Sequence, residues 1–147
     1  MWVKPYKYKV PRAKRPDRLD RLEPIPNDEG LTGLVQGQRA SDLEERFARA
    51  LYKLKLRFWF QFYVYTAYSL PGEDKVVDFV VDAGLMWPIE VDASFTHKTS
   101  EQRQYDKIRD AHVDEALGRA GYQRIQRIPG EKLATQDLAN QKAADLF

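Results

Sequence analysis

The order of apolar and polar residues predicts a helix, three strands, a second helix, a strand and a final helix over residues 41–146. Ser41 and Glu44 form a Ser-x-x-Glu capping box ahead of apolar residues at helical spacing. This signature predicts a first helix that begins at Ser41 and ends near Arg57. Helices and strands in this order are typical of an α/β domain in which helices cover the faces of a mixed sheet.

Three strands are predicted between the first two helices. Residues 56–70 are rich in aromatic side chains and predict a long strand, and residues 71–74 (Pro-Gly-Glu-Asp) predict a turn into the strand that carries Asp78. Residues 83–88 then turn the chain again into a strand at residues 89–92. The pattern therefore predicts a central unit of adjoining strands.

A second capping box, Thr99 with Gln102, predicts that the next helix begins at Thr99 or Ser100. The apolar stripe of this helix is expected to face inward through Tyr105, Ile108, Ala111 or His112, and Ala116. Residues 122–128 predict a short strand, and residues from about 135 to 146 predict a last helix.

The first 40 residues differ in composition from the rest. Residues 1–30 hold five prolines and little apolar periodicity, which predicts an extended arm, and three glycines in residues 30–40 predict a flexible link. Residues 1–22 contain eight Lys and Arg but only two Asp, so the arm is basic. It can follow a phosphate backbone, or it can be a solvated terminus. The candidate contacts in the arm are Lys4, Lys7, Lys9, Arg12, Lys14 and Arg15.

Length and composition exclude several classes of protein. The 147 residues are expected to form one folded domain at residues 41–147 after an arm and linker at residues 1–40. No cysteine is present, which excludes disulfides and thiolate zinc sites. No run of about 18 apolar residues or signal-peptide pattern is found, so we expect a soluble, cytoplasmic protein with no membrane partner.

Three acids occupy positions where apolar residues would be expected. Asp78 interrupts a run of valine and phenylalanine, and Glu90 and Asp92 flank Val91, so that both acids point to the same face of their strand. A buried carboxylate is costly unless it is paired, hydrogen-bonded or bound to a metal. A set of oxygen ligands suits Mg²⁺. The acids therefore predict a metal centre, or else carboxylates that accept hydrogen bonds separately.

The order Glu44, Asp78, Glu90-x-Asp92 and His97, followed by Tyr105-Asp-Lys-Ile-Arg-Asp and Gly121-Tyr-Gln-Arg-Ile, resembles the PD-(D/E)XK nuclease superfamily. Within it, the chain is most similar to the small very-short-patch-repair-like endonucleases of phages and mobile elements, which carry a run like Ile-Glu-Val-Asp-Gly-x-x-x-His. The resemblance covers about residues 41–129. It implies a restriction-endonuclease-like mixed sheet flanked by helices.

The resemblance also implies roles for individual residues. Asp78 and Glu90 are expected to bind the metal, Glu44 to add an outer contact, and His97 to lie beside the scissile phosphate. The lysine usual two residues after the Glu is Asp92 here, and the glycine that usually follows is alanine. His97, with an intrinsic pKa of about 6.5, is therefore the candidate that assists the attacking water.

These features together predict a metal-dependent DNA endonuclease that hydrolyses phosphodiester bonds by attack of metal-activated water. Asp78, Glu90 and Asp92 are expected to hold Mg²⁺, for which Mn²⁺ should substitute. One site cuts one strand, so double-strand cutting would require a homodimer or two events. The cations expected to neutralise the phosphates beside the site are Lys98, Arg103, Lys107 and Arg109.

Simpler interpretations remain open. Glu44 can act as a helix cap alone, His97 can be structural, and Asp106, Arg109 and Asp110 can form ion pairs within the helix. Two other functions also fit the sequence. One is a catalytically reduced DNA-binding or assembly protein with the same fold, and the other is an RNA-directed or junction-resolving nuclease.

Overall fold

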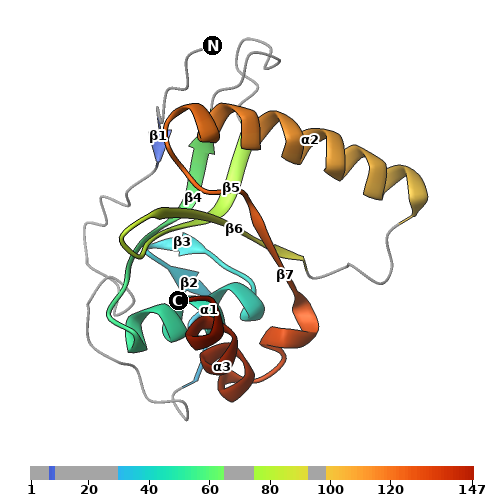
Figure 1. Cartoon of the computed structure of the whole chain (residues 1–147). Coiled ribbons are helices and arrows are strands. Elements are labelled where there is room, and N and C mark those ends of the chain that lie inside the picture. Colours follow the sequence, from blue (N-terminus) through green and yellow to red (C-terminus); the bar gives the residue numbers. More distant parts are fainter. Residues whose placement is uncertain (1–6, 9–29, 65–74, 93–98) are drawn as a thin grey trace.

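The computed structural model describes residues 7–8, 30–64, 75–92 and 99–147. Its main sheet is mixed, with the strand order β1-β4-β5-β6-β7, in which only β6 and β7 pair in parallel (Figure 1). The prediction of an α/β fold with a mixed sheet is confirmed. Most of the arm, the turn predicted at residues 71–74 and the end of the long strand predicted at residues 56–70 lie outside the described residues.

The sheet strands are β1 (Lys7–Tyr8), β4 (Arg57–Val64), β5 (Lys75–Asp82), β6 (Met86–Asp92) and β7 (Gln126–Pro129). A separate hairpin consists of β2 (Leu34–Val35) and β3 (Gln38–Arg39). The helices are α1 (Asp42–Lys53), α2 (Ser100–Arg119), the 3-10 helix η3 (Gly130–Leu133) and α3 (Gln136–Leu146). The predicted order of elements from residue 41 onward is therefore confirmed.

Both predicted capping boxes form. The Ser41 side chain accepts a hydrogen bond from the Glu44 backbone N–H, and the Glu44 carboxylate accepts one from the Ser41 N–H. Thr99 and Gln102 make the same reciprocal pair at the start of α2. Each box satisfies backbone donors that an α-helix leaves without a partner in its first turn.

Helix α1 ends at Lys53, earlier than the predicted end near Arg57. Lys55 adopts a left-handed conformation with φ of 58°, and the Leu56 N–H donates to the Leu51 carbonyl at 3.0 Å. This is the pattern of a Schellman motif, which normally uses glycine at the left-handed position. The sequence has lysine there, so the local signal for the helix end is missing.

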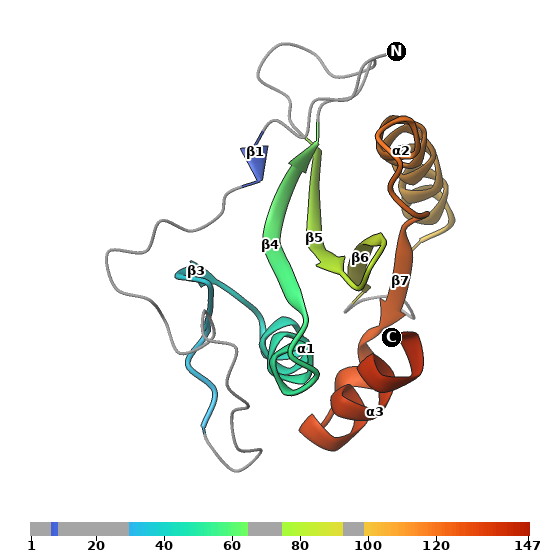
Figure 2. The same ribbon diagram turned by 60° about the vertical axis from the view of Figure 1, so that its left-hand side comes forward.

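The core has two parts. Helices α1 and α3 pack together on a cluster rich in aromatic rings, in which the Phe79 ring centroid lies 5.1 Å from that of Phe47 and 5.0 Å from that of Phe60. Helix α2 packs through Val113 and Leu117 on a second cluster, which contains residues of β4 and β5. Figure 2 shows α2 well separated from α1 and α3. Strands β4 and β5 thus contribute side chains to both clusters.

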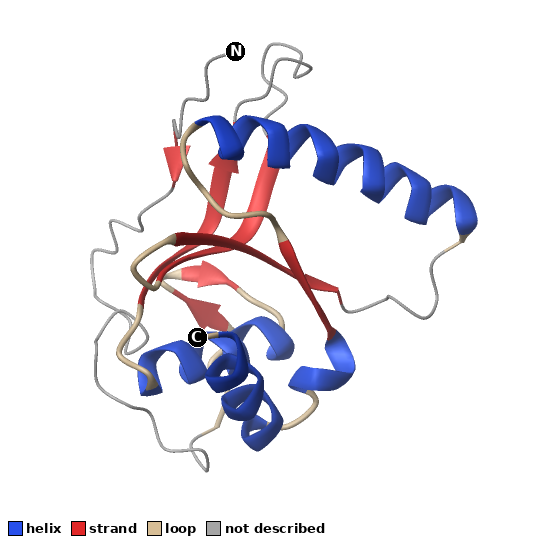
Figure 3. Ribbon diagram, in the orientation of Figure 1, coloured by secondary structure: helices blue, strands red, loops and turns tan. Residues whose placement is uncertain are grey.

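Only the second half of α2 is packed in the manner predicted. Ala116 is buried together with Val113 and Leu117, but Tyr105 is 62% exposed and Ile108 is 52% exposed, so the predicted inward stripe is wrong for these two residues. The cause is that the first half of α2 extends past the edge of the sheet (Figure 3). Although α2 has 20 residues, neither it nor any other described helix has the apolar length needed to cross a bilayer.

Residues 30–40, expected to be a flexible link, contain the β2–β3 hairpin and are anchored to α1. The anchor is Glu45, a fully buried carboxylate that accepts hydrogen bonds from the backbone N–H groups of Thr32 at 2.8 Å and Gly33 at 2.6 Å. Arg49 also donates to Glu45 at 3.0 Å. Several donors thus offset the cost of burying this charge.

Candidate functional site

The candidate site lies where β5 and β6 separate. Among the described residues, the antiparallel pairing of these strands ends at Phe79 and Ile89, and from Ile89 onward β6 pairs in parallel with β7. Asp78 and Glu90 are the first residues beyond the last pair. We call this point the fork. The predicted acids on two neighbouring strands are therefore brought together.

Strand β4 is distorted beside the fork. In this described strand, Phe60 pairs with Phe79 and Phe62 pairs with Val77, but Gln61 between them has no partner in the ladder. The β5 residue between Val77 and Phe79 is Asp78, which therefore lies opposite Gln61. Gln61 has a φ of 60°, in the left-handed region that L-residues seldom adopt. Such a conformation costs about 1 kcal/mol or more, and this kind of strain is found most often at functional sites.

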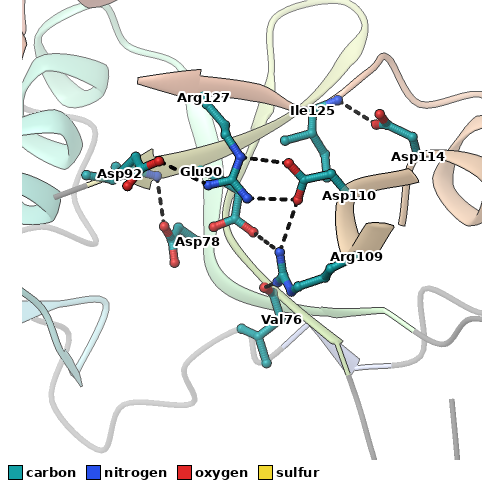
Figure 4. Close-up of polar contacts among 10 residues, drawn as sticks. Val76, Asp78, Glu90, Asp92, Arg109, Asp110, Asp114, Ile125 and Arg127 are labelled. Atoms are coloured by element: carbon teal, nitrogen blue, oxygen red, sulfur yellow. Dashed lines mark hydrogen bonds and ion pairs between the residues drawn. The ribbon is translucent and has the colours of Figure 1, made fainter. Parts of the chain in front are cut away.

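The Asp78 and Glu90 carboxyl groups face each other (Figure 4). One Asp78 oxygen accepts a hydrogen bond from the Val91 backbone N–H at 2.8 Å. Burial and the charge and hydrogen bond of Glu90 raise the pKa of Asp78 to about 8, while the Val91 N–H and the charge of Arg109 oppose this rise. Asp78 therefore holds its proton more tightly than an ordinary aspartate does.

Glu44 belongs to this acidic group as well as to the capping box of α1. Burial raises the pKa of Glu44, and the charge of Asp78 raises it further, against the lowering effect of the Ser41 hydrogen bonds. The carboxylate is therefore close enough to Asp78 for the two charges to repel each other. The cap and the contact with the site are compatible, because both use the same first turn of α1.

Arg109 reaches the fork from α2. Its Nη1 donates to Glu90 Oε1 at 3.0 Å, and its Nη2 donates to the Val76 backbone carbonyl. The same guanidinium lies 3.4 Å from Asp110. The sequence suggested that Arg109 either contacts phosphate or pairs within its helix. The structure shows that its contacts also bridge α2, β5 and β6.

A second arginine, Arg127 on β7, was not identified as a site residue from the sequence. It stands opposite Glu90 in the parallel ladder, binds Asp110 through Nε and Nη2, and lies 3.5 Å from Asp92. Burial lowers its pKa, but the hydrogen bond and charge of Asp110 outweigh this effect and raise it. The only sequence signal was a charged residue beside Ile128 in a short, partly buried strand.

Several predicted site residues are not brought to the fork by the described structure. Arg103 and Lys107 are exposed on the first half of α2. Lys7 lies in β1, which pairs with β4. The remaining predicted residues lie outside the described parts of the chain: Lys4, Lys9, Arg12, Lys14, Arg15, His97 and Lys98.

Among the described residues, no three acidic or histidine side chains are gathered as a ready set of metal ligands. Asp92 is held by Arg127, and Glu90 by Arg109. The pair of Asp78 and Glu90 nevertheless suits Mg²⁺, which commonly binds through one or two carboxylates and keeps several waters. Among the residues that the structure describes around the fork, the charge balance also favours a cation, because five carboxylates meet the two guanidinium groups of Arg109 and Arg127. The carboxylates are those of Glu44, Asp78, Glu90, Asp92 and Asp110.

Comparisons with protein-family models, with curated proteins and with solved structures find no match to this chain. The resemblance in motif order to the PD-(D/E)XK nucleases therefore stays a hypothesis about its family.

Proposed function

We propose that the protein is a metal-dependent endonuclease with a restriction-endonuclease-like core, which hydrolyses phosphodiester bonds in DNA. The main observation in support is that Asp78 and Glu90, from two neighbouring strands, meet at the fork, where burial and the charge of Glu90 raise the pKa of Asp78. A bound Mg²⁺ would neutralise these acids, polarise the phosphate and activate a water molecule.

The residues at the fork have distinct parts in this proposal. Asp78 and Glu90 would hold the ion, and the Val91 N–H fixes one oxygen of Asp78 by a hydrogen bond. Asp92 stays with Arg127, which makes it a weaker candidate for a ligand than the other two acids. Proton transfer remains assigned to His97, and contact with the DNA backbone to the basic arm.

The direct test is cleavage of supercoiled DNA in Mg²⁺ or Mn²⁺ by Asp78→Asn and Glu90→Gln variants. Each substitution should lower the cleavage rate about 100-fold or more, because a ligand charge is lost while the side-chain shape is kept. Asp82→Asn is the matched control, since Asp82 is the last residue of β5, beside the turn and away from the fork. The proposal fails if both variants cut as fast as this control.

The products of the wild-type protein then define the assembly. A monomer with one site should give nicked circles, whereas a homodimer should give linear DNA. Sedimentation at the assay concentration links the product to the oligomer, and replacement of the duplex by RNA or by a four-way junction tests the other nuclease substrates.

A second function has a specific observation in its favour. Arg109 and Arg127 already pair with Glu90 and Asp92, and Asp92 stands where the resemblance expects a lysine. These features fit a DNA-binding or assembly protein that has lost turnover. DNA binding in a mobility-shift assay, without cleavage in Mg²⁺ or Mn²⁺, would select this alternative.

A further inference from the structure

Arg109 is bound to an oxygen of Glu90, one of the two acids proposed to hold a cation. The Glu90 side chain is only 9% exposed, so its charge requires a partner, and Arg109 Nη1 supplies one at 3.0 Å. The guanidinium is held in place because its other nitrogen binds the Val76 carbonyl on the opposite side of the fork. A divalent ion that shares the Glu90 oxygens must therefore compete with this arginine.

The structure also offers Arg109 another partner. Its Nη1 lies 3.4 Å from Asp110 Oδ1, and its side chain is 20% exposed, so it is not sealed inside the protein. A guanidinium that leaves Glu90 thus keeps a carboxylate neighbour and gains access to solvent. Asp110 and water would then partly offset the loss of the contact between Arg109 and Glu90. This partial compensation allows Arg109 to exchange Glu90 for other partners.

We propose that Arg109 is a tethered counter-ion of the acidic site, which neutralises Glu90 in the ion-free protein and is displaced from it when a divalent cation binds. This inference rests on the proposed function in one respect, namely that Asp78 and Glu90 bind such an ion. It goes further by assigning Arg109 a positioning role that opposes metal binding. The displaced guanidinium would then be free to meet a phosphate oxygen.

The test is titration of the full chain with Mn²⁺ alone in a calorimeter, without DNA. Arg109→Gln removes the charge but keeps a hydrogen-bond donor, and Arg119→Gln is the control, because Arg119 makes an exposed pair with Glu115 on the same helix. We expect Arg109→Gln to bind Mn²⁺ about 10-fold more tightly than the wild type. The affinity of Arg119→Gln should not change.

A third variant keeps the test decisive if Arg109→Gln does not fold. Arg109→Lys retains the charge but lacks the planar guanidinium that binds Glu90 and the Val76 carbonyl together. This variant should therefore also bind Mn²⁺ more tightly than the wild type, by a smaller factor. Wild-type binding with no gain in the folded variants overturns the inference alone. Absence of Mn²⁺ binding in every protein, the wild type included, overturns the proposed function as well.

Discussion

Asp110 and Arg127 meet through two parallel hydrogen bonds, from Nε to Oδ2 at 2.7 Å and from Nη2 to Oδ1 at 2.9 Å, which join α2 to β7. Lysine cannot make this paired contact. Arg127→Lys should therefore lower the free energy of unfolding by about 1–3 kcal/mol, measured by urea denaturation. Arg119→Lys, in an exposed pair, should change it by less than about 0.5 kcal/mol. Equal losses in the two variants would contradict the importance of the paired geometry.

Asp78 should make the stability depend on pH. Its pKa rises from an ordinary value of 3.8 to about 8 in the folded chain, so the folded chain holds a proton that the unfolded chain loses between these values. This stabilising contribution is complete below about pH 4 and is lost as the pH rises through 8. Asparagine does not titrate. The stability of Asp78→Asn relative to the wild type should therefore rise by a few kcal/mol from pH 4 to 8.

This comparison is made by urea denaturation in a chelator at a series of pH values. Asp82→Asn is the control, because Asp82 ends β5 away from the fork and its side chain accepts a hydrogen bond from the Gly84 N–H. Parallel curves for Asp78→Asn and the wild type would show that the carboxyl group does not hold the proton in the native state.

Glu45 should be important for the attachment of the β2–β3 hairpin. Glu45→Ala leaves Arg49 as a buried charge without its carboxylate and removes the acceptor of the Thr32 and Gly33 N–H groups, so a loss of about 3 kcal/mol or more is expected. Hydrogen exchange should show faster exchange in residues 30–40. The exposed acid Asp42, in the same helical turn, provides the control variant Asp42→Ala, which should cost less than about 1 kcal/mol.

The two capping boxes should differ in their effect on the whole protein. Ser41→Ala should lower the unfolding free energy by about 1 kcal/mol, because α1 is packed in the core from its first turns onward. Thr99→Ala should mainly increase hydrogen exchange in the first two turns of α2, which lie beyond the sheet and can fray alone. A larger global loss for Thr99→Ala than for Ser41→Ala would show that this half of α2 is stabilised by contacts elsewhere.

The sequence predicted those parts of the fold that depend on local chemistry. The Ser41 and Thr99 caps and the order of the elements are set by nearby residues, and they are correct, whereas β6 begins at Met86, inside the turn predicted at residues 83–88. Two predictions were wrong, the end of α1 near Arg57 and the burial of Tyr105, and each has its own physical reason. A lysine takes a left-handed conformation that glycine would normally mark, and a helix with an apolar residue at the right spacing extends past the surface it would cover.

The candidate site was predicted only in part. Asp78 and Glu90 were predicted because each is an acid within a run of apolar residues, a pattern that indicates a buried charge. The arginines that balance them come from distant elements, and the pairing of Glu90 with Arg127 depends on the register of two parallel strands. The residues near Glu90 and Arg127 in the sequence carry no signal for that register, so the sequence does not predict Arg127 as a site residue. The contacts of Arg109 across the fork are likewise not predicted.

The overhanging first half of α2 has a mechanical consequence. Tyr105 lies one helical turn from Arg109, and the helix between them is continuous. Val113, the first buried residue of α2, lies one turn further along the helix. A force applied to the first half of α2 would therefore act on Arg109 before it acted on either hydrophobic cluster.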